Sequence, residues 1–176
     1  MVDLKEAVRA IPDFPKPGII FRDVTTLMGN SKAFAHSVDL LHDAYKAHEL
    51  DHIAGIEARG FVFGAALAHR LGKGFVPVRK KGKLPADTIS RTYDLEYGQD
   101  TLEIHKDAIT AGQRILMIDD LLATGGTALA AIDLVRQAGG EIVGAAFVVD
   151  LPELGGRRRL EEQGIAVLTL MEFEGH

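Results

Sequence analysis

The stretch that decides the fold is Ile115-Leu116-Met117-Ile118-Asp119-Asp120-Leu121-Leu122-Ala123-Thr124-Gly125-Gly126-Thr127. Its first four residues are apolar, which is typical of a strand buried on both faces. Two carboxylates follow where this strand emerges, and an open α/β sheet binds its ligands in that region. The glycines and threonines then lead into a predicted helix, whose free N-terminal amides can bind phosphate. An acidic surface turn with a glycine-rich connection is the alternative, but the whole combination is more specific than a short glycine loop.

Around this stretch, short apolar runs alternate with stretches of helical spacing. Strands are predicted at 52–57, 74–79, 114–119, 141–150 and 165–171, and helices at 31–48, 61–71, 126–138 and 156–163. This alternation predicts an α/β fold with an open, mainly parallel five-stranded sheet, right-handed crossovers and helices on both faces. Ser31 is the expected cap of the first long helix.

Two segments interrupt the alternation. Residues 11–26, the hood, hold three of the six prolines, so we expect an ordered loop there rather than a regular helix. Residues 80–107, the lid, contain two alternating runs around a glycine-containing turn, which indicates an inserted β-hairpin. Insertions of this size are often functional lids. We expect both within a single domain spanning residues 1–176.

The composition excludes several classes of protein. A formal net charge of -5 argues against binding nucleic acid through overall charge. There is no cysteine, which excludes disulfides, thiolate metal sites and cysteine nucleophiles. Residues 1–6 are charged where a secretory signal would be apolar, and no apolar stretch approaches membrane-spanning length. We therefore expect a cytoplasmic protein without nucleic-acid or membrane partners.

Two further motifs can bind anions. Glu57-Ala58-Arg59-Gly60 lies between a predicted strand and a predicted helix, so its amides and its guanidinium can hold a pyrophosphate. A surface arginine beside a helix cap is the alternative. The run Arg79-Lys80-Lys81-Gly82-Lys83 places four cations in five positions. Runs of charged residues usually form solvent-exposed surfaces. Here the central motif implies a polyanionic substrate, which favours a role of these cations in binding it.

Together these motifs resemble the type I phosphoribosyltransferases. The resemblance covers nearly the whole chain, is strongest to members that use adenine, and is carried by residues 14–23, 57–61, 79–85, 95–98 and 119–127. It implies a magnesium-dependent enzyme of purine salvage that converts adenine and 5-phosphoribosyl 1-pyrophosphate to AMP and pyrophosphate. It also implies a homodimer.

The resemblance assigns roles to individual residues, which fall into four groups. The implied catalytic residues are Glu96, Asp119 and Asp120, with magnesium at the two aspartates through water or substrate. The implied 5′-phosphate site is Ala123, Thr124, Gly125, Gly126 and Thr127. The implied pyrophosphate site is Glu57, Ala58, Arg59, Arg79, Lys80, Lys83 and Tyr97, with Arg79 reaching the neighbouring subunit's site. The implied adenine site is Ile20, Phe21 and Arg22.

These assignments have physical counterparts. Glu96 would act as a general acid or base at the purine when the lid closes and excludes water, although a lone glutamate there would otherwise face solvent. Phe21 can stack on a purine, and the backbone of Ile20 and Arg22 can read its hydrogen-bonding edges. Core packing by residues 19–21 is the alternative. In the family the turn at residues 57–58 often contains a cis peptide, so we expect strain there.

Two rival functions use the same fold. A regulator that senses phosphoribosyl pyrophosphate and binds nucleic acid carries an added DNA-binding module or a basic face, and this chain has neither the length nor the charge for one. A transferase for hypoxanthine, guanine, xanthine or orotate is the second rival, and only the resemblance favours adenine.

We interpret residues 157–159, three arginines, as the exposed start of a helix. The spacing of six between His36, His42 and His48 is no metal signature.

Overall fold

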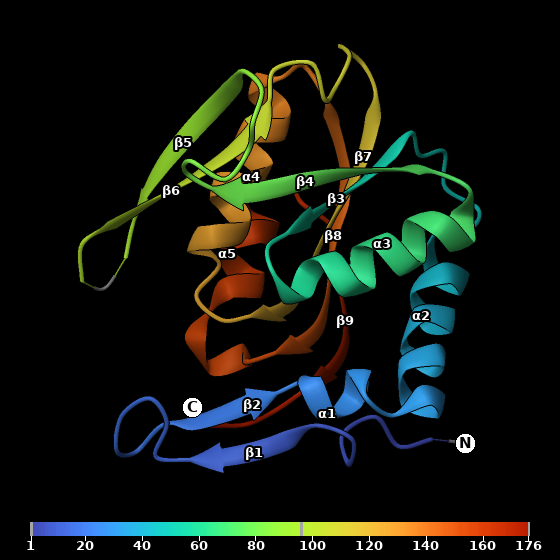
Figure 1. Ribbon diagram of the computed structural model, residues 1–176. Coiled ribbons are helices and arrows are strands. Elements are labelled where there is room, and N and C mark those ends of the chain that lie inside the picture. Colours follow the sequence, from blue (N-terminus) through green and yellow to red (C-terminus); the bar gives the residue numbers. More distant parts are fainter. Residues whose placement is uncertain (1, 96, 176) are drawn as a thin grey trace.

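The computed structural model describes residues 2–95 and 97–175, and within them it has an α/β fold around one seven-stranded sheet (Figure 1). The strand order is β5-β6-β4-β3-β7-β8-β9. Five neighbouring strands run parallel, and they are β3 (His52–Ile56), β4 (Gly74–Lys80), β7 (Arg114–Leu122), β8 (Glu141–Asp150) and β9 (Val167–Glu172). These are the strands that the apolar runs predicted.

The sheet has seven strands rather than the predicted five because the inserted hairpin joins it. Strands β5 (Thr88–Asp94) and β6 (Gln99–His105) pair antiparallel, and β6 also pairs antiparallel with the end of β4. Leu102 and Ile104 of β6 are fully buried in the core. The base of the lid is therefore part of the sheet, whereas its far end extends away from it (Figure 1).

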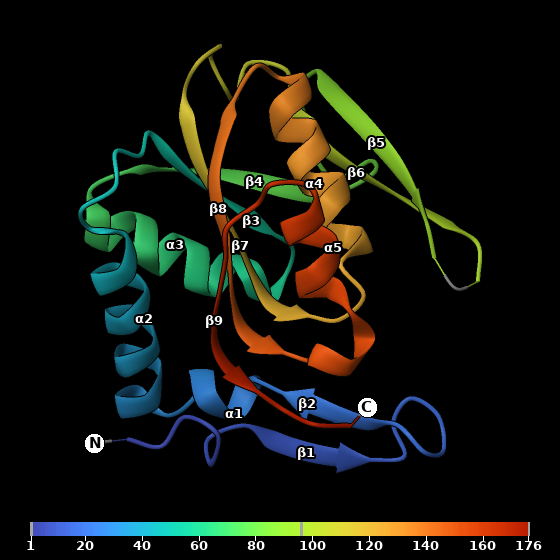
Figure 2. The ribbon, with the colours of Figure 1, turned by 180° about the vertical axis from the view of Figure 1, so that it is seen from behind.

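Helices cover both faces of the sheet, as predicted (Figure 2). One face carries α2 (Ser31–Tyr45) and α3 (Arg59–Leu71), and the other carries α4 (Gly126–Gln137) and α5 (Gly156–Glu162), which follows the 3-10 turn η1 (Pro152–Leu154). Each face has its own cluster of buried apolar side chains. The cap of α2 is Asn30 rather than Ser31, because the Asn30 side chain accepts hydrogen bonds from the amides of Lys32 and Ala33.

The hood has regular structure where an ordered loop was predicted. Strands β1 (Arg9–Pro12) and β2 (Ile20–Asp23) form a separate antiparallel pair, and the short helix α1 (Thr25–Met28) follows. The prolines lie at the end of β1 and in the connection, where the Phe14–Pro15 bond is cis, so they leave the ladder intact. The pair lies beyond the carboxyl end of β9 (Figures 1 and 2).

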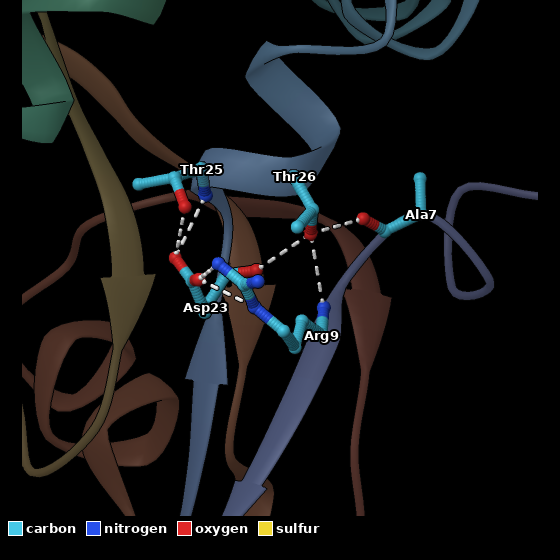
Figure 3. A network of polar contacts seen from close by, with 5 residues as sticks. All are labelled: Ala7, Arg9, Asp23, Thr25 and Thr26. Atoms are coloured by element: carbon cyan, nitrogen blue, oxygen red, sulfur yellow. Dashed lines mark hydrogen bonds and ion pairs between the residues drawn. The ribbon is translucent and has the colours of Figure 1, made fainter.

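Asp23 joins the parts of the hood (Figure 3). Its carboxylate accepts hydrogen bonds from the Thr25 hydroxyl at 2.6 Å and from Arg9 Nη2 at 2.6 Å. The Thr26 hydroxyl donates to the Ala7 carbonyl at 2.7 Å. The hydrogen bonds from Thr25 and Arg9 lower the pKa of Asp23 to about 2. The negative charge of Asp23 therefore stabilises β1, β2 and α1 as one unit.

None of the helices in the described part of the chain combines the length and the apolar character that a membrane crossing requires.

Candidate active site

Two carboxylates lie at the carboxyl end of β7, the middle one of the five parallel strands. Asp120 is buried, and its Oδ2 accepts a hydrogen bond from Arg59 Nε at 2.5 Å. The Asp119 carboxylate accepts one from the Asp120 amide at 2.8 Å. Burial and the neighbouring Asp120 carboxylate raise the pKa of Asp119 well above its ordinary value. Binding of a cation at this point would favour the ionised form of Asp119.

Arg59 reaches Asp120 because α3 begins unusually close to β7. A Cβ atom at Gly60 would lie 2.8 Å from Asp119 Oδ1 and 3.1 Å from the Ile118 carbonyl oxygen, so a larger residue does not fit. The turn before α3 contains a cis bond between Glu57 and Ala58, as the resemblance led us to expect. The first turn of α3 therefore packs directly against the end of the central strand.

Glu57 fastens this turn to the neighbouring strand β4. Its Oε1 accepts hydrogen bonds from the Lys80 amide at 2.7 Å and from Arg79 Nε at 3.2 Å. The Arg79 guanidinium also lies 5.9 Å from the centre of the Phe61 ring. In the described structure Glu57 and Arg79 therefore contact each other, and the proposed reach of Arg79 to another subunit stays a prediction.

The loop of residues 123–127 consists of the connection between β7 and α4, residues 123–125, and the first two residues of α4. Gly125 has a φ of 88°, a backbone conformation that glycine adopts readily, and it directly precedes the first residue of α4. The first intrahelical hydrogen bond runs from the Leu129 amide to the Gly125 carbonyl. The amides at the start of α4 are therefore available to a ligand. A cavity of about 220 Å³ lies here, lined by Arg59, Asp119, Asp120 and residues 121–128.

Helix α5 packs behind this loop. The Gly156 amide donates to the Ala123 carbonyl at 3.1 Å, and Arg159 Nη1 donates to the Thr124 carbonyl at 2.7 Å. Arg157 is half-buried and pairs with the buried Asp150 at 3.3 Å. The interpretation of residues 157–159 as only an exposed helix start is therefore wrong for Arg157 and incomplete for Arg159. The contact between Arg159 and Thr124 spans 35 residues, so no local pattern in the sequence indicates it.

Strand β6 supplies two acidic residues that the sequence analysis did not single out. Asp100 pairs with Lys80 Nζ at 3.1 Å. The buried Glu103 accepts hydrogen bonds from the Gly82 amide and from the hydroxyls of Thr88 and Ser90, each at 2.8 Å. These bonds lower the pKa of Glu103. Both carboxylates hold the basic run in place. The sequence could have indicated this role, because both residues lie in the hairpin predicted directly after the basic run.

A second cavity, of about 290 Å³, adjoins the first and brings several predicted residues together. It shares Arg59, Asp119, Asp120 and Thr127 with the first cavity, and it adds Glu57, Lys80, Tyr93 and Asp100 among its lining residues. Lys80 lines only the second cavity and residues 123–126 line only the first, whereas Arg59 and the two carboxylates line both. The two cavities form one site with two places for anions.

Three residues predicted to bind pyrophosphate, Lys83, Arg79 and Tyr97, do not line these cavities. Lys83 is exposed on the basic turn, and Arg79 faces Glu57. Tyr97 is 76% exposed, and its ring centre lies 4.6 Å from Lys16 Nζ of the hood. Glu96 falls outside the described residues. The roles of all four stay predictions.

The predicted adenine residues lie on β2. The Phe21 ring packs edge-on against Phe14, with ring centres 5.3 Å apart, and Ile20 is exposed. Neither residue belongs to the two buried clusters within the described chain, which argues against simple core packing. The Arg22 guanidinium lies over the Phe173 ring at 4.4 Å. The described part of the chain has no strand on the outer edge of β2, so that backbone edge is available for recognition.

Comparison with known proteins identifies the class to which this fold and site belong. The model of the phosphoribosyl transferase domain matches residues 27–166, so the chain belongs to this family. An adenine phosphoribosyltransferase of Rhizobium johnstonii is 58% identical over 174 residues, which are 99% of this chain and 97% of the relative. Within the family, the chain belongs to the adenine phosphoribosyltransferases.

Solved structures agree with this placement. A crystal structure of adenine phosphoribosyltransferase from Thermoanaerobacter pseudethanolicus has a TM-score of 0.92 and 52% identity, and the match covers 97% of this chain and 98% of the other. The Saccharomyces cerevisiae enzyme, complexed with D-2,5-dideoxy-2,5-imino-altritol 1,6-bisphosphate and adenine, has a TM-score of 0.89 and 43% identity, and the match covers 96% of each chain.

Proposed function

We propose that this chain transfers the phosphoribosyl group of 5-phosphoribosyl 1-pyrophosphate to adenine and releases AMP and pyrophosphate. The observation that carries the proposal is the pair of adjoining cavities around Asp119 and Asp120. One offers free helix amides to a 5′-phosphate, and the other offers Arg59 and Lys80 to a pyrophosphate. The two carboxylates between them fit the hydroxyl groups of a ribose. The substrate carries these three groups in the same order.

In the proposed reaction a ring nitrogen of adenine bonds to the anomeric carbon as the bond from that carbon to pyrophosphate breaks. The ribose passes through a cationic, oxocarbenium-like state. The chain's task is then positioning and electrostatic stabilisation, with no nucleophilic residue. The loop of residues 123–127 holds the 5′-phosphate, Arg59 and Lys80 stabilise the departing charge, and Asp119 and Asp120 orient the ribose. Glu96 acts as the general base that accepts the proton lost by this ring nitrogen.

Magnesium belongs to this proposal as a partner of substrate oxygens. No group of three or more His, Cys, Asp or Glu side chains suited to a metal occurs among residues 2–95 and 97–175. Asp120 is also engaged by Arg59. Hydrated magnesium fits beside Asp119 and Asp120 because hard cations often keep their waters and bind through substrate phosphates. When bound, it would neutralise charge on the pyrophosphate.

The hood supports the choice of adenine as the base. Phe21 offers an aromatic face, and the backbone of Ile20 and Arg22 offers donors and acceptors at the outer edge of β2. A wrong base would leave such groups unpaired, which discriminates strongly between bases.

We extend the proposal to a homodimer, in which Arg79 contributes to the neighbouring site. We also extend it to the cytoplasm, because charged phosphorylated substrates do not cross a lipid bilayer unaided.

The proposal is tested by pyrophosphate release from 5-phosphoribosyl 1-pyrophosphate and adenine, with magnesium and with magnesium chelated. Turnover should require the metal. Asp120→Asn and Glu96→Ala should each lower kcat by about a hundredfold, in the range of a lost acid-base or electrostatic group, while the circular dichroism spectrum stays unchanged. Wild-type rates in both variants would refute the catalytic assignments. Sedimentation of the purified protein tests the dimer.

A further inference from the structure

The loop of residues 123–127 is held from outside the active site. Arg159 donates from Nη1 to the Thr124 carbonyl oxygen at 2.7 Å, and the Gly156 amide donates to the Ala123 carbonyl oxygen at 3.1 Å. Both donors belong to the start of α5. Within the described chain neither donor residue lines the cavity beside the loop, so α5 contacts the loop on the side away from that cavity.

The direction of these two carbonyls fixes the direction of two amides. In a planar trans peptide the carbonyl of one residue and the N–H of the next point in opposite directions. The described cis bonds lie at residues 14–15 and 57–58, so both peptides of the loop are trans. With the carbonyls of Ala123 and Thr124 fixed towards α5, the N–H groups of Thr124 and Gly125 point away from α5. Among the described residues neither N–H has a protein acceptor.

Close packing supports the same arrangement. A Cβ atom at Gly156 would lie 2.5 Å from the Ala123 carbonyl oxygen, and one at Gly125 would lie 3.1 Å from the Gly156 Cα. The backbones of the loop and of α5 therefore touch directly. Arg159 adds a cation behind the loop, and a charge-assisted hydrogen bond is stronger than a neutral one.

We propose that Arg159 is a positioning residue for the 5′-phosphate, acting through the Thr124 carbonyl to hold the Gly125 amide towards the ligand. The inference rests on the proposed function, because it takes the loop as the 5′-phosphate site. Without the guanidinium, the peptide between Thr124 and Gly125 can rotate. Its carbonyl oxygen then competes with the phosphate for the same space and repels it.

Arg158 provides a matched control. It is the next residue of the same helix, it carries the same charge, and it is 84% exposed while pairing with Glu162 at 2.9 Å. Arg158→Met and Arg159→Met therefore remove the same side-chain chemistry from the same helix. Only Arg159→Met removes a contact with the loop. Arg159→Lys keeps the charge and a donor, so it tests whether the hydrogen bond can be restored.

The experiment is calorimetric titration of each protein with ribose 5-phosphate and, separately, with pyrophosphate and magnesium. Arg159→Met should weaken ribose 5-phosphate binding about tenfold, as expected for one charge-assisted hydrogen bond. Arg159→Lys should lie between it and the wild type. Arg158→Met should bind ribose 5-phosphate as the wild type does. Pyrophosphate affinity and the melting temperature should stay unchanged in all three variants.

The outcomes separate this inference from the proposed function. Wild-type affinity of Arg159→Met for ribose 5-phosphate would overturn the positioning role alone, because the contact with Thr124 would then not affect binding. Equal weakening in Arg158→Met would also overturn it, because the effect would then come from net charge. Equal weakening of pyrophosphate binding would also overturn it by indicating a general loss of structure. A wild-type protein that binds no ribose 5-phosphate would overturn the proposed function and this inference with it.

Discussion

At the scale of single residues, the site depends on two close approaches that only glycine permits. Gly60 lets α3 meet the end of β7, and Gly156 lets α5 meet the loop of residues 123–127. Both approaches place a cation: Arg59 beside Asp120, and Arg159 behind Thr124. Neither glycine contacts a ligand in the proposed function. Their role is to let each helix pack directly against the site, which brings Arg59 and Arg159 within hydrogen-bonding distance of it.

A substitution at Gly60 should therefore damage catalysis more than stability. In Gly60→Ala the new methyl group meets Asp119 Oδ1 at 2.8 Å and the Ile118 carbonyl oxygen at 3.1 Å, so the Asp119 carboxylate and the start of α3 must shift. Overpacking of this kind costs about 1 to 3 kcal/mol of stability. Because Arg59 moves with α3, kcat/KM should fall by about a hundredfold. Steady-state kinetics and thermal unfolding measure the two effects, and unchanged kcat/KM would refute the role given to this contact.

At the scale of elements, two acidic residues determine how the hood and the lid are attached. Asp23 joins β1, β2 and α1, and Glu103 joins β5, β6 and the basic turn. Both carboxylates are buried and accept several hydrogen bonds, which lower the pKa of each. The hood and the base of the lid are therefore ordered by charge and hydrogen bonding as well as by apolar packing.

The hood should lose stability in acid. Because the pKa of Asp23 falls from 3.8 to about 2 on folding, its stabilisation is complete above the unfolded value and is lost as the pH falls through about 2. The contribution is about 1 kcal/mol after allowance for the exposed Arg9 partner. Asp23→Asn should lower the melting temperature at pH 7, and the difference from the wild type should shrink between pH 4 and pH 2. A constant difference would contradict this account.

Glu103 should matter for the basic turn more than for the core. Glu103→Gln keeps the size of the side chain but removes the charge that the Gly82 amide and two hydroxyls share. We expect KM for 5-phosphoribosyl 1-pyrophosphate to rise about fivefold, with KM for adenine unchanged, because charge-assisted bonds are the stronger ones. Thr92→Val is a suitable control, since it removes the hydrogen bond between the Thr92 and Thr101 hydroxyls from the exposed part of the same hairpin. Equal effects of both changes would refute a specific role.

At the scale of the whole molecule, the sequence predicted the parallel strands well because each is a short apolar run between glycines or polar turns. It also predicted Asp119 and Asp120 at the ligand-binding edge of the sheet, where the parallel strands end. The resemblance assigned Arg59, Lys80 and Thr127 to the same substrate, and all five residues line one cavity. Local patterns could not show that β6 would pair with β4, or that Arg159 would reach Thr124. The strands of the hood were not predicted because the segment contains three prolines, and proline disfavours the hydrogen-bonded pairing of strands except at their ends.

The central claim is that this site transfers a phosphoribosyl group to adenine, and one assay tests it most directly. Pyrophosphate release is measured with 5-phosphoribosyl 1-pyrophosphate, magnesium and a panel of adenine, hypoxanthine, guanine, xanthine and orotate. We predict that kcat/KM for adenine exceeds that for every other base by at least about a thousandfold, as expected when a wrong base leaves buried hydrogen-bonding groups unpaired. Equal turnover of guanine or hypoxanthine, or no turnover of adenine, would contradict the account.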